Sequence, residues 1–369
     1  MSSLSFPAWL MLALATLAGS VLFTWLSLVY ASRRRMIDQP GQRRSHSVPT
    51  PRGGGTGIVL AVVAGLSACW IAGADSVDIS SFIALLASIM LVALVGWIDD
   101  HGGLGALVRL LAHAASALLL GVPVMLLDGH GILANPALPW ILAALLACAI
   151  AIVWSINLHN FMDGINGLLA TQAIFVFSAL SWLCLEAGRS AEAQRIGLLL
   201  MATLGFLPFN FPRARIFMGD VGSGVLGLLI IVSIGWQIAA VPGEPFYGLI
   251  ACSAFVVDST ATLLSRMLSG RRWYSAHREH LYQWLVRSGF SHARVVGFYM
   301  AWNLLVVVPA LLWVHRESAI MGASSRGHAM SLPAGSEVLF SIYAIGALVW
   351  VFGKRYCLNR CKDSRVTAS

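Results

Sequence analysis

Apolar runs of about 20 residues recur along the whole chain, and they constrain its fold more than any other feature. Each is long enough to cross the hydrocarbon core of a bilayer as a helix. Only 11% of the 369 residues are charged, against about 25% in soluble globular domains, and the mean hydropathy is +0.79. Eleven spans are predicted, with ten as the alternative count: 8–31, 57–74, 81–98, 104–127, 138–156, 167–187, 193–209, 222–241, 245–266, 294–314 and 333–353.

Basic residues predict how the spans are oriented. The first run resembles an uncleaved anchor and is followed by a cluster of arginines, which the positive-inside rule places in the cytoplasm. With the N-terminus outside and eleven spans, 19 of the 24 Lys and Arg residues fall in cytoplasmic segments and four fall outside. The sequence therefore predicts an all-α polytopic membrane protein with a cytoplasmic C-terminus.

Composition also bounds the organisation and the partners. We expect one transmembrane catalytic domain over 1–353, with its motifs in 38–294, and a short basic cytoplasmic tail over 354–369. The net charge of +8 suits membrane lipid headgroups and phosphorylated substrates, and nothing indicates nucleic-acid binding. Four of the six cysteines lie in apolar spans, so a disulfide framework is not expected.

A polar stretch interrupts two apolar runs at 157–168. Asn157, Asn160, Asp163 and Asn166 recur at every third residue, beside Gly164 and one further glycine. On an α-helix these side chains would fan over about half the circumference, and on a 3₁₀ turn they would form one row. Polar groups at a membrane boundary are costly unless they bind something, so this stretch is a candidate site.

The third span ends in two adjacent carboxylates, Asp99 and Asp100. Neighbouring carboxylates repel each other unless a cation or a shared proton relieves them, and a helix C-terminus disfavours negative charge. The pair therefore indicates divalent-metal or acid–base work, with a solvated interfacial turn as the alternative. Arg109 and His113 share one face of the next span, and Arg109 is expected to pair with one of the aspartates.

A broken segment precedes the eighth span. Two prolines and Asn210 end the seventh span, Phe217 follows, and a glycine-flanked Asp220 opens the next helix. Free amides and the positive dipole end favour an anion there, and a carboxylate beside phosphate-binding groups is a common way to hold Mg²⁺. The alternative for Asp220 is a plain helix cap.

Two further cytoplasmic segments carry basic and aromatic groups. The loop before the second span combines prolines, arginines and a glycine triplet, either as a lipid-facing linker or as an anion receptor. The loop at 271–294 contains His277, Arg278 and His280, either on an amphipathic surface helix or in a cap that contacts a diphosphate. Asp258, in the ninth span, is expected to have a structural role.

Together these motifs identify the chain by resemblance. The segments Gly-Trp-Ile-Asp99-Asp100, Asn157–Leu168, Ile-Phe217-Met-Gly-Asp220 and His277-Arg-Glu-His280-Leu-Tyr-Gln resemble the polyprenyl-phosphate N-acetylhexosamine-1-phosphate transferases, glycosyltransferase family 4. The loop Pro49-Thr-Pro-Arg-Gly-Gly also matches, and all the motifs occur in the family's order.

The resemblance implies a reaction and a set of roles. A polyprenyl phosphate, undecaprenyl phosphate in bacteria, attacks the β-phosphorus of a UDP-N-acetylamino sugar, and UMP leaves. Mg²⁺ is the implied cofactor, with Mn²⁺ as an alternative ion, and a homodimer remains open. The implied residues are Asp99, Asp100 and Asp163 as catalytic groups, Asp220 and Asn160 at the metal, and Asn157, Asn160, Asn210, Phe217, His277, Arg278 and His280 at the substrates.

The sequence departs from the family pattern at two points. Asn166 stands where many relatives have a second aspartate, and the His-Arg-x-His pattern differs from the triple histidine of the peptidoglycan-precursor branch. The chain is thus more similar to the branch that initiates O-antigen or other surface polysaccharides, with the active site on the cytoplasmic face of the inner membrane. The sugar stays open among N-acetylglucosamine, N-acetylgalactosamine and 6-deoxy relatives. The rival class is a secondary transporter or lipid flippase, whose polar groups would lie near the bilayer midplane.

Overall fold

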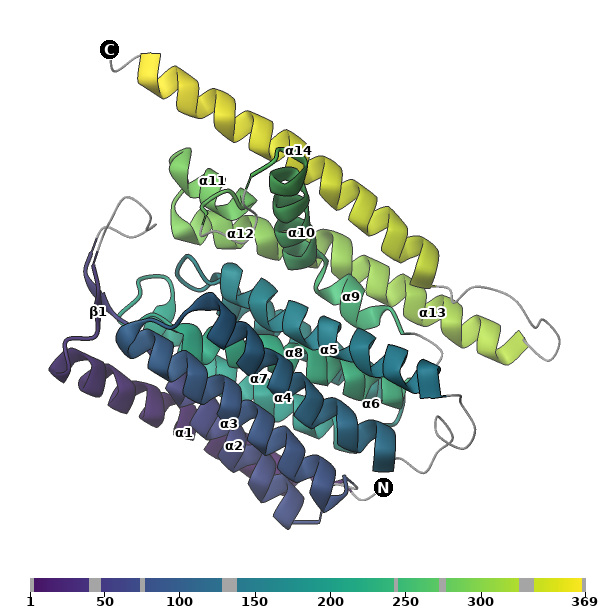
Figure 1. The fold of residues 1–369 in the computed structure, drawn as a ribbon. Helices are drawn as coiled ribbons and strands as arrows, with labels where there is room; N and C mark the ends of the chain where they lie inside the picture. The colour runs from purple at the N-terminus through teal and green to yellow at the C-terminus, as the bar shows by residue number, and fades with distance from the viewer. Residues whose placement is uncertain are drawn as a thin grey trace.

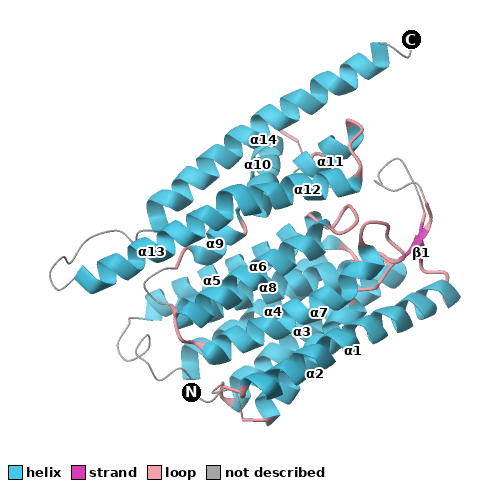
Figure 2. Cartoon of the chain, turned by 180° about the vertical axis from the view of Figure 1, so that it is seen from behind, coloured by secondary structure: helices cyan, strands magenta, loops and turns pink. Residues whose placement is uncertain are grey.

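The computed structural model describes residues 3–39, 48–73, 77–127, 138–241, 245–271, 277–324 and 335–366. Almost all regular structure in these ranges is helical (Figures 1 and 2). The helices are α1 (Phe6–Arg33), α2 (Thr56–Ile71), α3 (Ile79–Gly102), α4 (Ala106–Leu127), α5 (Leu138–Phe161), α6 (Leu168–Glu186), α7 (Ser190–Asn210), α8 (Asp220–Ala240), α9 (Tyr247–Ala251), α10 (Ser253–Leu268), α11 (Leu281–Arg287), α12 (His292–Trp302), the π-helical turn η1 (Asn303–Val307), α13 (Val308–Ser324) and α14 (Gly335–Val366).

The all-α membrane fold predicted from the apolar runs is confirmed. Seven helices within the described ranges are long and apolar enough to cross a bilayer, and α2 and α4 are shorter apolar helices. Helix α7 is more polar because it carries Glu192 and Arg195, which form a buried ion pair of 3.8 Å between Oε1 and Nη2. The helix α14 continues to Val366, so most of the predicted basic tail over 354–369 is helical.

Helix α8 lies at the centre of the first eight helices, packed against α3 and α5. Small residues bring the backbones close together: Gly227 of α8 faces the backbone of Ser155, whose hydroxyl donates to the Gly227 carbonyl at 2.7 Å. Lipid supplies no hydrophobic driving force between helices, so the close packing that small residues allow stabilises their association. The close packing fixes where the first residue of α8 can lie.

The predicted span 245–266 is not one continuous helix, and this part of the prediction is wrong. The structure breaks it at Cys252 into α9 and α10. A break leaves backbone carbonyls without intrahelical partners. The Ala251 carbonyl instead accepts the side-chain amide of Gln172 at 3.2 Å, and Asn303 donates to the other end of that amide at 2.7 Å. Side chains of α6 and η1 therefore compensate for the broken ladder.

The helices form two layers. Both views show α10, α11, α12 and α14 on one side of the bundle that contains α1–α8 (Figures 1 and 2). The short strands β1 (Ile37–Asp38) and β2 (Thr50–Pro51) pair antiparallel beside the C-terminal end of α1. Because the helices α1–α8 alternate in direction, the ends of α3 and α5 and the start of α8 lie at this same end of the molecule (Figure 1).

Candidate active site

Asp100 is the residue through which α3 holds the start of α8. Its carboxylate is 4% exposed and accepts the backbone N–H of Asp220 at 3.1 Å and of Val221 at 3.3 Å. Both amides belong to the first turn of α8 and have no intrahelical acceptor. Gly219 has φ +75°, and a Cβ there would lie 2.4 Å from Asp100 Oδ2, so a glycine is required for this approach.

Asp99 faces a different partner. Arg109 of α4 places Nη1 3.1 Å from Asp99 Oδ2 and 3.2 Å from Asp220 Oδ2. The pairing of Arg109 with an aspartate is therefore confirmed, and the same guanidinium also contacts the aspartate of α8. Arg52 compensates the second carboxylate, with Nε 3.9 Å from Asp100 Oδ1, and it donates to the Asp100 carbonyl. Two arginines thus relieve the repulsion among three acidic side chains.

The polar row at 157–166 does not act as one face. Asn160 donates its amide to Asp220 Oδ1 at 3.2 Å and so belongs to the acidic cluster. Asn157 instead donates to the Val153 carbonyl at 2.8 Å, and its Nδ2 lies 3.3 Å from Nδ1 of His113. Asn157 therefore joins α5 to α4, which is a positioning contact.

A polar cavity of about 220 Å³ opens beside the acidic cluster. Five of the residues selected from the sequence line it: Asp100, Asp163, Asn210, Phe217 and Asp220. Removal from bulk water, together with the carboxylates of Asp220 and Asp100, raises the pKa of Asp163 well above its usual range. This environment therefore disfavours the charged form of Asp163.

Asn210 and the backbone of Phe217 shape the cavity wall. The Asn210 side chain accepts the Gly167 N–H at 2.7 Å and donates to the Ile216 carbonyl at 3.0 Å. Because both ends of this amide are bound to backbone, Asn210 fixes the loop before α8. The N–H of Phe217 donates to the Pro51 carbonyl at 2.8 Å, which joins that loop to β2. The Phe217 side chain remains partly exposed to the cavity.

His277, Arg278 and His280 precede α11 in non-helical backbone, so a surface helix carrying both histidines is not what forms. The two imidazole centroids lie 5.0 Å apart. Burial lowers the pKa of His277 to about 4 and also lowers the pKa of His280, so both rings are neutral at pH 7. Within the described residues, the buried Nδ1 of His277 lacks a hydrogen-bond partner, whereas Nδ1 of His280 lies 3.9 Å from Oδ1 of Asp258.

Tyr282 connects this run to the polar stretch. Its hydroxyl donates to the Phe161 carbonyl at 2.9 Å and accepts from Gln283 at 3.1 Å. A Cβ on Gly164 would lie 2.1 Å from the same oxygen, so α11 packs directly on the turn that carries Asp163. His280 itself is not among the residues that line the cavity, whereas Gln283 is.

The donor set of the acidic cluster suits Mg²⁺. Among the described residues, no group of three or more His, Cys, Asp or Glu side chains could hold a metal ion by itself. Mg²⁺ commonly takes one or two carboxylates and completes its shell with water and substrate phosphates. Asp99 and Asp220 offer such carboxylates, and the Arg109 guanidinium contacts both of them.

Several cavity residues had not been selected as site residues from the sequence. They are Asp38, Arg52, Gln283 and His292, whereas Asn166 belongs to the polar stretch but had no role assigned to it. Arg52 carried a signal, because it sits in the proline- and glycine-rich loop for which an anion receptor is one of the two interpretations. His292 begins α12, and its Nδ1 accepts from the Asn166 N–H at 3.4 Å. This contact depends on the packing of α12 against α6, which no local pattern indicates.

Comparison with known proteins identifies the family. Residues 82–236 match the model of glycosyl transferase family 4. The chain is 26% identical over 292 residues to a probable undecaprenyl-phosphate N-acetylglucosaminyl 1-phosphate transferase of Bacillus subtilis, covering 75% of this chain and 79% of the relative. It is 25% identical over 305 residues to an undecaprenyl-phosphate alpha-N-acetylglucosaminyl 1-phosphate transferase of Yersinia pestis, covering 79% of each.

A third relative is more similar. The chain is 31% identical over 316 residues to a decaprenyl-phosphate N-acetylglucosaminephosphotransferase of Mycobacterium tuberculosis, and the match covers 76% of both chains. The similarity extends well beyond the family model, across most of the helical bundle described above. The chain therefore belongs to glycosyl transferase family 4, the polyprenyl-phosphate N-acetylhexosamine-1-phosphate transferases.

Proposed function

We propose that this protein transfers an N-acetylamino-sugar 1-phosphate from a UDP-sugar to a polyprenyl phosphate, releasing UMP and starting the assembly of a cell-surface glycan. One observation carries the proposal, which is the set of contacts around Asp220 at the edge of a polar cavity. Arg109 joins Asp220 of α8 to Asp99 of α3, and the side-chain amide of Asn160 donates directly to Asp220. Separate helices thus bring acidic and basic groups to one point, as the chemistry of two phosphorylated substrates requires.

The chemistry asks mainly for positioning and charge neutralisation. A phosphate monoester has a second pKa near 6, so the lipid phosphate is already largely dianionic at pH 7 and needs no strong base. Arg109 and Arg52 supply fixed positive charge at the acidic cluster. When bound, Mg²⁺ supplies further charge neutralisation for the substrate phosphates, held by Asp220 and Asp99 with Asn160 orienting Asp220.

The two ends of the donor fit different walls of the site. Phe217 lies partly exposed in the cavity and offers an aromatic face for uracil, while Asp163 and Gln283 offer hydrogen bonds. Arg278 is the cation of the His277–His280 run, and the neutral His277 ring has a buried Nδ1 without a hydrogen-bond partner among the described residues. We assign this run to the donor diphosphate.

Sidedness and donor identity follow from separate arguments. The excess of Lys and Arg in the segments at this end of the bundle supports a site on the cytoplasmic face of a bacterial inner membrane. Three relatives are named for N-acetylglucosamine, so UDP-N-acetylglucosamine is the first donor to test. O-antigen assembly is the pathway we favour because the His-Arg-x-His run departs from the triple histidine of the peptidoglycan-precursor branch.

The transporter alternative makes a different structural demand. A transporter would place its polar groups near the bilayer midplane. Here Asp99 and Asp100 occupy the last turn of α3, Asn160 the last turn of α5, and Asp220 the first position of α8. Groups at helix ends favour chemistry at the membrane surface.

The test uses purified protein with undecaprenyl phosphate, Mg²⁺ and a panel of UDP-N-acetylamino sugars, with UMP release as the readout. We expect release with one donor, and we expect it to require both the lipid phosphate and the metal ion. Release without lipid phosphate would instead indicate hydrolysis. Folded protein that releases no UMP with any donor, yet moves lipid in a liposome flux assay, would contradict the proposal.

A further inference from the structure

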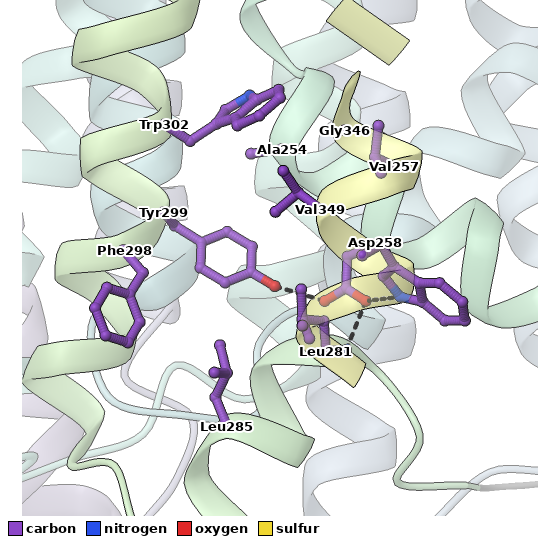
Figure 3. A pocket seen from close by; sticks show the side chains of 12 residues that line it. Ala254, Val257, Asp258, Leu281, Leu285, Phe298, Tyr299, Trp302, Gly346 and Val349 are labelled. Atoms are coloured by element: carbon purple, nitrogen blue, oxygen red, sulfur yellow. Dashed lines mark hydrogen bonds between the residues drawn. The ribbon is translucent and has the colours of Figure 1, made fainter. Parts of the chain in front are cut away.

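Asp258 is a buried carboxylate outside the active-site cavity. It lies on α10, is 2% exposed and borders an apolar cavity of about 210 Å³ between α10, α11, α12 and α14 (Figure 3). An acidic side chain within a membrane bundle is expensive unless its lone pairs are satisfied. The identity of its donors therefore indicates what the residue does.

Two of the donors are backbone amides at the start of α11. Leu281 N–H donates to Asp258 Oδ1 at 2.7 Å, and Tyr282 N–H donates to Oδ2 at 3.3 Å. The first amides of a helix have no intrahelical acceptor, and a carboxylate near them also favours the helix dipole. Since His280 is the residue before Leu281, Asp258 fixes the backbone at the point where the His277–His280 run ends.

The remaining donors come from α12, from α14 and from the next turn of α10 itself. Tyr299 of α12 donates its hydroxyl to Oδ2 at 2.6 Å, Trp350 of α14 donates Nε1 to Oδ1 at 3.1 Å, and Thr262 donates to Oδ1 at 3.3 Å. Figure 3 shows Tyr299 and Leu281 converging on Asp258. Hydrogen bonds to a charged acceptor are stronger than neutral ones. One carboxylate therefore joins α10, α11, α12 and α14.

Further contacts bring α14 against the same region. Lys354 Nζ lies 3.4 Å from Ser265 Oγ on α10, and Ser288, just after α11, donates to Cys357 Sγ at 3.6 Å. The C-terminal helix thus contacts both the helix that carries Asp258 and the end of α11. The segment that follows the His277–His280 run is therefore held on two sides. The layer of α10 and α14 contacts one side, and Tyr282 packs against Gly164 on the other.

We propose that Asp258 is a positioning residue for the transfer reaction: it fixes the His277–His280 run at the donor diphosphate and couples that run to the C-terminal helix through Trp350. The inference rests on the proposed function, which assigns that run to the diphosphate. Asp258 itself touches no substrate. Its effect passes through the backbone of Leu281 and Tyr282 and through His280, whose Nδ1 lies 3.9 Å from Asp258 Oδ1.

The test compares Asp258→Asn and Trp350→Phe with the control Tyr343→Phe. Tyr343 also lies on α14, about two turns before Trp350, and it donates to the Leu249 carbonyl at 3.0 Å rather than to Asp258. Asparagine has one acceptor oxygen and an NH₂ that would face donors, whereas Trp350→Phe removes only the indole N–H. Two quantities are measured on the full-length protein: hydrogen exchange of the peptide covering 277–287, and KM and kcat for UMP release.

We expect exchange of that peptide to accelerate about tenfold in Asp258→Asn and several-fold in Trp350→Phe, with no change in Tyr343→Phe. The KM for the UDP-sugar should rise in the same order, while kcat at saturating donor should fall less. Size-exclusion chromatography checks that each variant is folded, and Trp350→Phe keeps the test decisive if Asp258→Asn does not fold.

Unchanged exchange in a folded Trp350→Phe or Asp258→Asn variant overturns the inference. Faster exchange with unchanged KM also overturns it, because the run would then be anchored but not used by the donor. If wild-type protein releases no UMP with any donor, the proposed function fails by itself. The exchange measurement still decides whether Asp258 anchors the run.

Discussion

The carboxylate of Asp100 accepts the backbone N–H of Asp220 at 3.1 Å, so one acidic residue caps the helix that begins with another. This contact brings the end of α3 to the start of α8 and leaves the Asp220 side chain facing Arg109 and Asn160. Adjacent residues in the sequence thereby receive separate tasks. Asp100 holds the backbone, and Asp99 shares the Arg109 guanidinium with Asp220.

Asp220→Asn should abolish transfer while the protein remains folded in the membrane. The substitution keeps the shape of the side chain but removes the charge that faces Arg109 and that suits a divalent ion. The matched control is Asp78→Asn at the opposite end of α3, where Asp78 caps the helix and asparagine caps equally well. UMP release should be lost only in the first variant. Full turnover of Asp220→Asn at limiting Mg²⁺ would contradict the metal assignment.

Asp99→Asn and Asp100→Asn should differ in what they lose. Asp100 is buried and its two oxygens accept two backbone N–H groups. Asp100→Asn should therefore lower the free energy of unfolding by about 1–3 kcal/mol, and it should also lower turnover. Asp99→Asn should cut turnover strongly with a smaller loss of stability. Thermal unfolding in detergent, paired with UMP release, separates the two. Equal stability losses would refute this division of roles.

Arg109→Lys should retain part of the activity, and Arg109→Gln should retain almost none. Lysine keeps the positive charge between Asp99 and Asp220 but not the planar, multiply donating guanidinium. We expect kcat to fall roughly 10-fold for lysine and roughly 100-fold or more for glutamine, which corresponds to about 1.4 and 2.7 kcal/mol. The control is Arg316→Gln, an exposed arginine on α13. Equal rates for lysine and glutamine would show that charge at this position is irrelevant.

Gly164→Ala should displace α11 from the polar stretch. The new Cβ would lie 2.1 Å from the Tyr282 hydroxyl, whereas a Cβ on Gly105 would meet nothing within 4 Å. We expect a several-fold rise in the KM for the UDP-sugar in Gly164→Ala and little change in Gly105→Ala. Adding Tyr282→Phe to Gly164→Ala removes the clashing oxygen and should restore part of the affinity. A double variant as weak as the single one would place the defect elsewhere.

His277→Gln should make the protein more resistant to acid. Burial lowers the pKa of His277 to about 4 in the folded state, while an unfolded histidine has a pKa near 6.5. The unfolded chain therefore binds more protons between these values, and folded stability falls as the pH drops from about 6.5 towards 4. Because His277 is only half buried, solvent screening reduces the effect, and removing the group should raise stability at pH 5 by about 1 kcal/mol or less relative to its effect at pH 8. Melting curves of both proteins at the two pH values measure the difference, which a constant offset would contradict.

Periodicity and charge predict most of the architecture. Long apolar runs determine helices in a bilayer because no other open structure satisfies the backbone there, and arginine placement orients them. The break at Cys252 is absent from these signals, since its compensation comes from Gln172 and Asn303, far away in the sequence. A local pattern contains no information about such distant partners.

The sequence predicted which residues form the site better than how their side chains are arranged. The motifs selected Asp99, Asp100, Asn160 and Asp220, which the structure brings together. They also selected Asn157, whose amide joins α5 to α4, because spacing alone does not reveal which way each side chain points. Asp258 was expected to have a structural role, but its partners on α11, α12 and α14 depend on tertiary packing.

The order of these partners along the chain has a consequence for synthesis. Asp100 precedes the Asp220 amide that it accepts by 120 residues, so α3 is translated well before α8. Arg109 follows Asp99 by only ten residues and contacts it at 3.1 Å. The counter-ion for the acidic end of α3 is therefore translated almost immediately after it, and α8 joins later. Arg109 can thus pair with Asp99 during synthesis, before Asp220 is present.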